Sequence, residues 1–166
     1  METTDGVEDV VEGAGDIIQH LETLHNNPFL FARTLANFYA VMPPQKGSLL
    51  LAYLVLPIAL HAPARILLKK NSGRTTLRSF LLERDRIFGL ERRVQEWREI
   101  TNATVQYLTG ANILAIKSDL AVTCTRDFDL EDISPIDVAT SAKALGRIFA
   151  PYDVPTIYRM LGVMKL

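Results

Sequence analysis

The Lys and Arg residues between positions 63 and 99 are the polar feature of this sequence with the most evident chemical use. That segment carries ten bases against five acids. Guanidinium and ammonium groups bind phosphates, or the carboxylates of a partner protein, when they are free of acidic neighbours. The candidate contact residues are Lys69, Lys70, Arg74, Arg78, Arg86 and Arg93.

Two interpretations of these bases remain open. The first four have no acidic neighbour in the sequence. Thr75 or Thr76, which lies among them, can cap a helix whose backbone amides would also attract an anion. Arg86 and Arg93 alternate with acidic residues, a pattern typical of a solvated helix with local ion pairs. The segment is therefore either a face that binds phosphates or acids, or an ordinary charged surface.

The charge of the whole chain hides an asymmetry along it. The 18 Lys and Arg nearly cancel the 19 Asp and Glu, which leaves a net charge of -1. Yet the first 26 residues hold seven acids and no Lys or Arg, whereas residues 63–99 have a net charge of +5. The near-neutral total excludes a protein that coats nucleic acid by bulk charge alone. The two charged segments could still engage each other, a partner or DNA.

No pattern in the sequence indicates catalysis or metal binding. It has no Walker-type phosphate loop, no Rossmann glycine fingerprint and no nucleophile elbow. His20 and His25 are spaced wrongly for one helix face, and the acidic run at 127–132 lacks the glycine and final glutamate of a calcium loop. Cys124, the one cysteine, is expected to be an inert core side chain. We expect no catalytic residue, no metal, no cofactor and no enzyme activity.

The elements that position the bases are predicted to be helical. We expect an acidic flexible tail at 1–15 and a single compact, mainly helical domain at 16–166. Apolar spacing predicts helices at 16–25, 28–42 and 49–60, with Pro57 bending or ending the last of these near Val55 and Leu56. The apolar run at 49–60 is too short to span a bilayer and no secretory signal is present. We therefore expect a cytoplasmic protein.

Residues 75–124 follow the order of a winged helix-turn-helix. Helices are expected after Thr75 or Thr76, near Arg84 and after Thr101. Two short apolar runs, at 113–116 and 120–124, flank a turn and predict a small β-hairpin. Three helices followed by a hairpin match the winged-helix order, with the hairpin as the wing. The turn carries a single base, Lys117, which gives little support for a wing that reads a DNA groove.

Two further helices are predicted near the C-terminus. Ser134 and Pro135 provide a cap and a first-turn proline for one of them, and Asp153 begins the other. The aromatic and methionine residues there are suited to docking a partner. This candidate patch comprises Phe149, Tyr152, Tyr158, Met160, Leu161 and Met164. The alternative, for all except Met164, is that these side chains complete the core.

Short motifs follow one another in a characteristic order along the chain after residue 26. They are Asn27-Pro28, Phe38-Tyr39, the segment 54–58 with His61 and Arg65, Thr76-Leu77, Leu145-Gly146-Arg147 and the segment 156–163. In this order and spacing they resemble the middle component of bacterial ABC-three-component systems. That group is related to Lamassu-type anti-phage defence.

The resemblance implies a non-catalytic accessory subunit with a winged-helix-like part. Such a subunit would link an SMC- or Rad50-like ABC ATPase to an effector such as a nuclease, and it would meet DNA through the complex. The residues alone keep a second class open, a free-standing winged-helix DNA-binding regulator that uses residues 69–110 as its recognition surface. Neither class requires a membrane or a cofactor.

Overall fold

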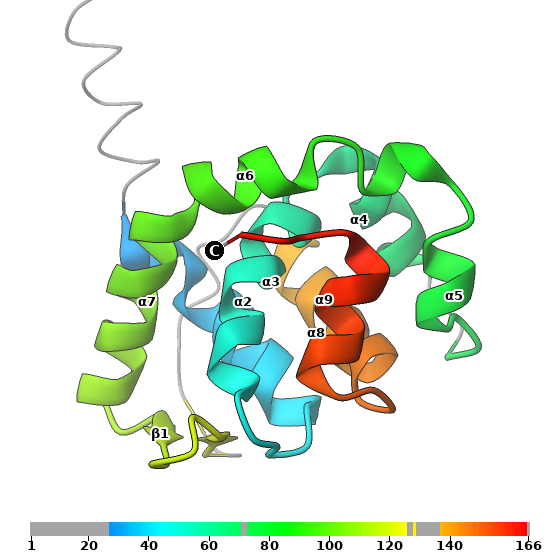
Figure 1. Ribbon diagram of the computed structural model, residues 1–166. Coiled ribbons are helices and arrows are strands. Elements are labelled where there is room, and N and C mark those ends of the chain that lie inside the picture. Colours follow the sequence, from blue (N-terminus) through cyan, green and yellow to red (C-terminus); the bar gives the residue numbers. More distant parts are fainter. Residues whose placement is uncertain (1–26, 71–72, 126–127, 129–136, 166) are drawn as a thin grey trace, which may run out of the picture.

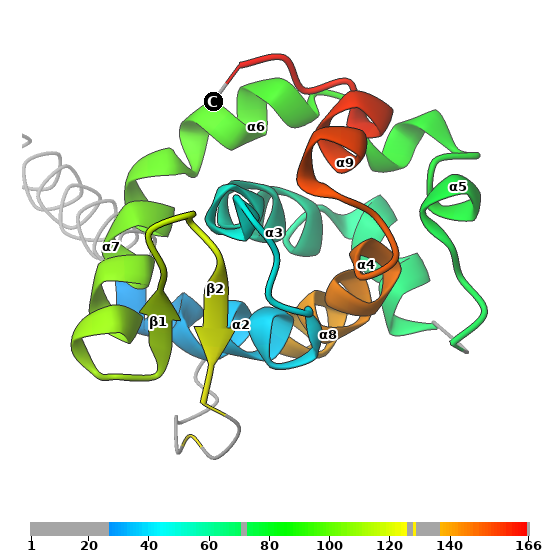
Figure 2. The ribbon, with the colours of Figure 1, turned by 60° about the horizontal axis from the view of Figure 1, so that its bottom comes forward.

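The computed structural model describes residues 27–70, 73–125, 128 and 137–165 (Figures 1 and 2). The predicted tail at 1–15, the helix at 16–25 with its two histidines, the acids at 127–132 and the cap at Ser134 lie outside these ranges. The described chain is mainly helical with one two-stranded antiparallel sheet, which confirms the predicted fold class. Its elements are α2 (Pro28–Val41), η1 (Ser48–Leu51), α3 (Ala52–Ala59), α4 (Ala62–Lys69), α5 (Leu77–Phe80), η2 (Arg84–Arg86), α6 (Leu90–Glu96), α7 (Arg98–Gly110), β1 (Leu114–Ile116), β2 (Val122–Cys124), α8 (Val138–Phe149) and α9 (Val154–Leu161).

Helix α2 is the central element of the fold and packs against α8 and α7. It begins where the sequence predicts. Asn27 Oδ1 accepts a hydrogen bond from the Phe29 amide at 3.0 Å, and Pro28 occupies the first turn. In the core the ring of Phe38 meets that of Phe149 edge to face, with centroids 6.1 Å apart. The pairing of α2 with α8 therefore forms the centre on which the other helices pack.

Helix α3 does not break at Pro57 as the sequence suggested. It continues to Ala59, and the sharp change of direction, 98°, comes between α3 and α4 instead. Pro57, Ile58 and Ala59 are buried in the core, and this burial offsets the hydrogen bond that proline cannot donate. Within the described ranges, no single helix is long and apolar enough to cross a membrane; the segments 48–59 and 62–69 meet that test only as a bent pair.

The predicted hairpin is present, but the winged-helix arrangement of residues 75–124 is not confirmed. Strands β1 and β2 pair antiparallel, with Ala115 opposite Thr123. Helix α5 spans only four residues. Helices α6 and α7 pack mainly on α3 and α2, so residues 75–124 do not enclose a separate three-helix core. The local order of elements was predicted correctly, whereas their packing depends on helices outside the segment.

The tip of the hairpin is held against the body of the protein. The amides of Gly47 and Leu49 donate to the carbonyls of Asp119 and Leu120, at 2.9 and 3.0 Å. The Val122 amide donates to the hydroxyl of Ser48 at 2.9 Å, across 74 positions of sequence. Figure 2 shows the hairpin beside α2 and α7. A wing that enters a DNA groove needs a tip that projects from the protein. The tip of this hairpin is instead hydrogen-bonded to the segment 47–49.

The N-cap of α9 predicts a specific dependence of stability on pH. Hydrogen bonds from the hydroxyl and the amide of Thr156 lower the pKa of Asp153 in the folded protein. A carboxyl whose pKa is lower folded than unfolded stabilises the fold above the unfolded pKa of about 3.9. That stabilisation disappears as the pH falls through the folded pKa.

We expect Asp153→Asn to retain the cap but lose this acid-sensitive contribution, because asparagine also caps helices well and does not titrate. Urea unfolding of both proteins between pH 3 and pH 7 measures it. The free energies of unfolding should differ most near neutral pH and converge in acid. A difference that is constant with pH would contradict the assignment.

Candidate partner-binding surfaces

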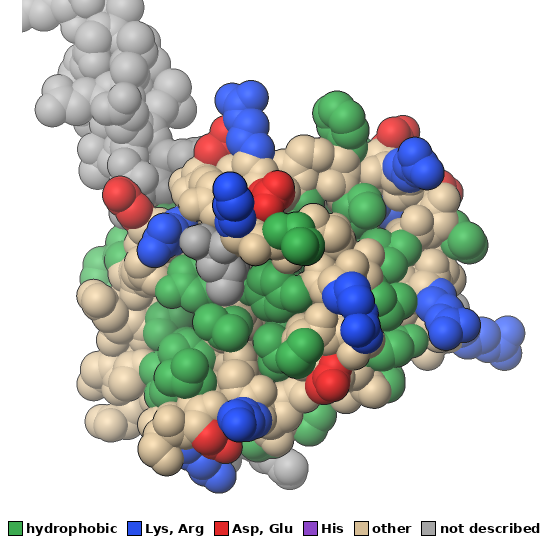
Figure 3. All heavy atoms as spheres, in the orientation of Figure 1, with side chains coloured by type: hydrophobic (Ala, Val, Ile, Leu, Met, Phe, Trp, Pro, Cys, Tyr) green, Lys and Arg blue, Asp and Glu red, His purple; other side chains and the backbone are tan. Residues whose placement is uncertain are grey.

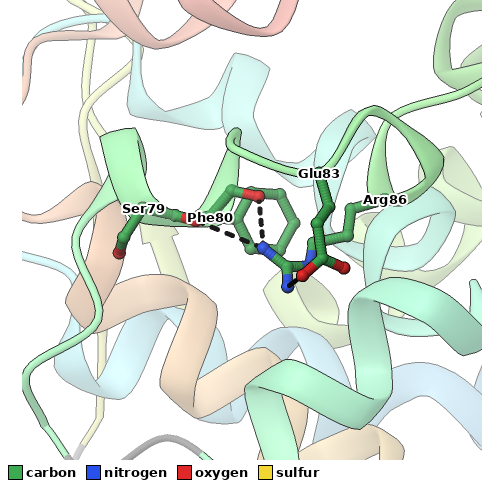
Figure 4. A network of polar contacts seen from close by, with 4 residues as sticks. All are labelled: Ser79, Phe80, Glu83 and Arg86. Carbon is green, nitrogen blue, oxygen red and sulfur yellow. Dashed lines mark hydrogen bonds and ion pairs between the residues drawn. The ribbon is translucent and has the colours of Figure 1, made fainter.

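Arg86 is a structural clamp in the fold, whereas the sequence placed it among the candidate contact residues. Only 8% of the residue is exposed. Its Nη1 donates to the carbonyls of Ser79 and Phe80 at 3.2 and 3.1 Å, and its Nη2 pairs with Glu83 Oε1 at 2.7 Å (Figure 4). The largely buried guanidinium therefore holds η2 against the end of α5.

Arg93 also contacts carbonyl groups of the protein. Its Nε donates to the Pro57 carbonyl, in the last turn of α3, at 3.2 Å, and its Nη1 donates to the carbonyl of Phe88. A cation at the C-terminal end of a helix is favourable because carbonyl groups and the helix dipole converge there. Burial lowers the pKa of Arg93, and the nearby Glu96 opposes that effect. Arg93 thus joins α6 to α3.

Lys69 forms an ion pair that the sequence could not reveal. Its Nζ lies 2.6 Å from Oδ2 of Asp137, the residue that precedes α8. The pair joins the last residue of α4 to the start of α8 across 68 positions of sequence. Because 59% of the lysine side chain is exposed, the contribution to stability is small, under about 1 kcal/mol. Lys69 is therefore only partly available to a partner.

The remaining predicted bases are exposed. Lys70, Arg74 and Arg78 lie on the surface, and no hydrogen bond or ion pair engages their side chains within the described part of the chain. Two of the amides at the start of α5, where the sequence suggested an anion site, already have partners within the protein. The Thr76 hydroxyl accepts from the Ser79 amide at 3.2 Å and the Ser79 hydroxyl accepts from the Thr76 amide at 2.9 Å, so a capping box already uses both amides.

A depression lies between α4, α5 and η2, beside these exposed bases. Its volume is about 270 Å³, and it contains both charged and apolar groups. It is lined by Leu67, Arg74, Thr75, Ser79, Leu82, Glu83 and Arg86. This basic pocket brings together Arg74, which the sequence singled out, and Leu82, which it did not.

The C-terminal residues of the candidate docking patch separate into core and surface. Phe149 and Leu161 are buried in the main core. Tyr152, Tyr158 and Met160 are half-buried and pack against it. The Tyr158 hydroxyl donates to the Leu50 carbonyl at 2.6 Å, which fixes α9 to η1. Met164 is 85% exposed, so it is the member of the patch most open to a partner.

Large apolar side chains outside the predicted docking patch are also exposed to solvent. Leu82 is 81% exposed, Phe88 79% and Ile66 58%. Figure 3 shows hydrophobic side chains at the surface, with Lys and Arg side chains mostly around their edge. Leu82 follows the end of α5 and Phe88 follows η2, so neither lies on the buried face of a helix.

Cys124 is half-buried on β2. Its Sγ lies 3.6 Å from the carbonyl oxygen of Ala36, and burial raises the pKa of the thiol to about 11. Among the described residues, no three His, Cys, Asp or Glu side chains come together as metal ligands would. Cys124 is therefore held as the neutral thiol near neutral pH.

We expect this thiol to react slowly with an aromatic disulfide reagent. Because the unfolded thiol has a pKa of about 8.5, its thiolate fraction at pH 7 is roughly 300-fold higher than in the folded protein. Release of the coloured thiolate from the reagent, followed with and without 8 M urea, measures both rates. A folded protein that reacts as fast as the unfolded one would contradict the expectation.

Comparison with known families gives one match. The family model described as "ABC-three component (ABC-3C) system Middle Component 3" matches residues 16–165, which include every element described above. No curated protein and no solved structure matches the chain.

Proposed function

The chain belongs to the Middle Component 3 family of ABC-three-component systems, and from this premise we propose that it is a non-catalytic accessory subunit of such a system. In this proposal it links an SMC- or Rad50-like ABC ATPase to an effector such as a nuclease. The complex would act in the cytoplasm in Lamassu-related anti-phage defence, and DNA would be contacted through the complex.

The observation that carries the proposal is the extent of the family match, from residue 16 to residue 165. The same domain supplies both candidate surfaces, the basic pocket and the C-terminal patch around Met164. Arg and Met are enriched at protein interfaces, and each surface exposes one of them, Arg74 in the pocket beside the exposed Leu82 and Met164 in the C-terminal patch. Two separate surfaces on one small domain are what a linking subunit needs.

Pairwise binding to the other components tests the proposal. The ATPase and the effector encoded beside this chain are each co-expressed with it, and the mixtures are analysed by size-exclusion chromatography. We expect the chain to co-elute with at least one of them, at a volume well ahead of the free chain. A chain that elutes as a free monomer at all concentrations, with either component present, would contradict the accessory role.

The alternative function is a free-standing DNA-binding regulator. The exposed and unpaired Lys70, Arg74 and Arg78 favour it. Fluorescence anisotropy with random duplex DNA at low and moderate salt separates the two functions. A regulator binds alone, with a steep salt dependence that is lost when these residues and Lys69 become alanine. An accessory subunit binds DNA only when the ATPase is present.

A further inference from the structure

We propose that the basic pocket between α4, α5 and η2 docks an acidic segment of a partner component. A carboxylate of that segment pairs with Arg74, and a large apolar side chain next to it packs on Leu82. The inference rests on the proposed function, since it names the surface through which the subunit would hold another component. It commits to a protein partner whose docking residues combine one acid with one large apolar group.

The charges that line the pocket leave room for one carboxylate. Two guanidinium groups and one carboxylate face it, from Arg74, Arg86 and Glu83. Glu83 is already paired with Arg86, with Oε1 and Nη2 2.7 Å apart. Arg74 is exposed, and no described residue pairs with it. The lining therefore has a net charge of +1, and the unpaired Lys70 and Arg78 lie close to it in the chain.

The apolar part of the pocket accounts for the second feature of the partner. Leu82 lines the pocket and is 81% exposed, while Leu67 lies opposite on α4 and packs against the core. The volume of about 270 Å³ lies just below the range of small-molecule sites, which is roughly 300–1,000 Å³. It suits one or two side chains of a protein. Arginine is enriched among the residues that contribute most to the affinity of protein interfaces, and the exposed Leu82 adds apolar area next to Arg74.

The walls of this pocket are fixed before any partner binds. The capping box of Thr76 and Ser79 sets the start of α5, and the Arg86 clamp joins the end of α5 to η2 (Figure 4). A backbone segment held in place in the free protein loses little conformational freedom on binding. The pocket is thus organised to receive a partner without first having to fold.

A protein segment fits this surface better than nucleic acid does. Phosphates along a DNA strand would approach two exposed acids, Glu83 and Asp85, and would gain nothing from the exposed Leu82. Protein–DNA interfaces are strongly positive and polar. A partner segment that brings one carboxylate and an adjacent apolar side chain can instead pair with Arg74, pack on Leu82 and keep clear of both acids.

The test measures the affinity of the full chain for the neighbouring ATPase and effector components, each immobilised in turn for biolayer interferometry. Leu82→Ser and Arg74→Glu are compared with two matched changes outside the pocket and outside the C-terminal patch, Leu120→Ser on the hairpin and Lys143→Glu on α8. All four residues are exposed, so the folds should persist, and thermal melts check this. We expect Leu82→Ser and Arg74→Glu each to weaken binding to one component about tenfold or more. The matched changes should alter it less than about twofold.

The outcomes separate the inference from the proposed function. If neither component binds the wild-type chain, both fail. If a component binds but Leu82→Ser and Arg74→Glu leave its affinity unchanged, only the pocket is wrong. The same result is expected if the acidic residues 1–26 of the chain, or a second copy of the chain, occupy the pocket instead of a partner component. Loss of duplex DNA binding by Arg74→Glu, with Leu82→Ser harmless in every assay, would make the pocket a nucleic-acid site and overturn the inference.

Discussion

Replacing Gly146 by alanine is expected to destabilise the protein by about 2 kcal/mol. A Cβ at this position would lie 2.7 Å from both the Phe38 carbonyl oxygen and Val41 Cγ2. The carbonyl belongs to the backbone of α2, so it cannot move aside without shifting that helix. Overpacking of this kind costs about 1–3 kcal/mol. Alanine recovers at most about 1 kcal/mol through its better helix propensity, so the steric cost dominates.

The matched control for this change is Gly110→Ala. Gly110 is the last residue of α7, and a Cβ there meets nothing within 4 Å. The same substitution should therefore leave stability unchanged or raise it by up to about 1 kcal/mol. Urea unfolding monitored by circular dichroism gives both values. Equal effects at the two glycines would show that the close approach of α2 and α8 at Gly146 is not as described.

The second large effect is expected at Arg86. Its truncation to alanine leaves the carbonyls of Ser79 and Phe80 without their charged donor and removes the partner of Glu83. Hydrogen bonds to a charged group are worth about 1.5–3 kcal/mol each, although such values do not add fully. We expect a loss of about 2–4 kcal/mol in the free energy of unfolding. Truncation of an exposed arginine would lower the free energy of unfolding far less.

Glu83→Gln distinguishes the clamp from the ion pair within it. The Glu83 side chain is 70% exposed, so removal of its charge should cost less than about 1 kcal/mol. Arg86→Lys keeps the charge but lacks the forked donor that reaches two carbonyls and Glu83 together, and it should give an intermediate loss. If Glu83→Gln destabilised the protein as much as Arg86→Ala, the carbonyl contacts would not be the main contribution.

Local signals in the sequence predicted the elements of the fold well. Asn27 and Pro28 marked the start of α2, Asp153 marked that of α9, and the two short apolar runs marked the hairpin. Each depends on contacts between residues close together in the chain. A local signal also predicted that the helix would bend or end near Pro57. That prediction of a helix end was wrong, because burial of Pro57 in the core outweighed the hydrogen bond that proline cannot donate.

The roles of the basic residues could not be predicted in the same way. Arg93 meets a carbonyl 36 positions away, and Lys69 meets a carboxylate 68 positions away. Sequence neighbours suggested that Lys69 was free, whereas a distant carboxylate pairs with it. Arg86 was a candidate contact residue, whereas carbonyls six and seven positions earlier bind its guanidinium and bury it. Arg74 and Leu82 line one pocket because η2 and α5 are clamped together. No spacing rule along the chain encodes that proximity.

Mass photometry of the ATPase and effector components, co-expressed with and without this chain, tests the linking role most directly. We expect one particle that contains both components only when the chain is present. Without the chain, the ATPase and the effector should appear as separate species. A particle of ATPase and effector that forms equally well in the absence of the chain would contradict the linking role.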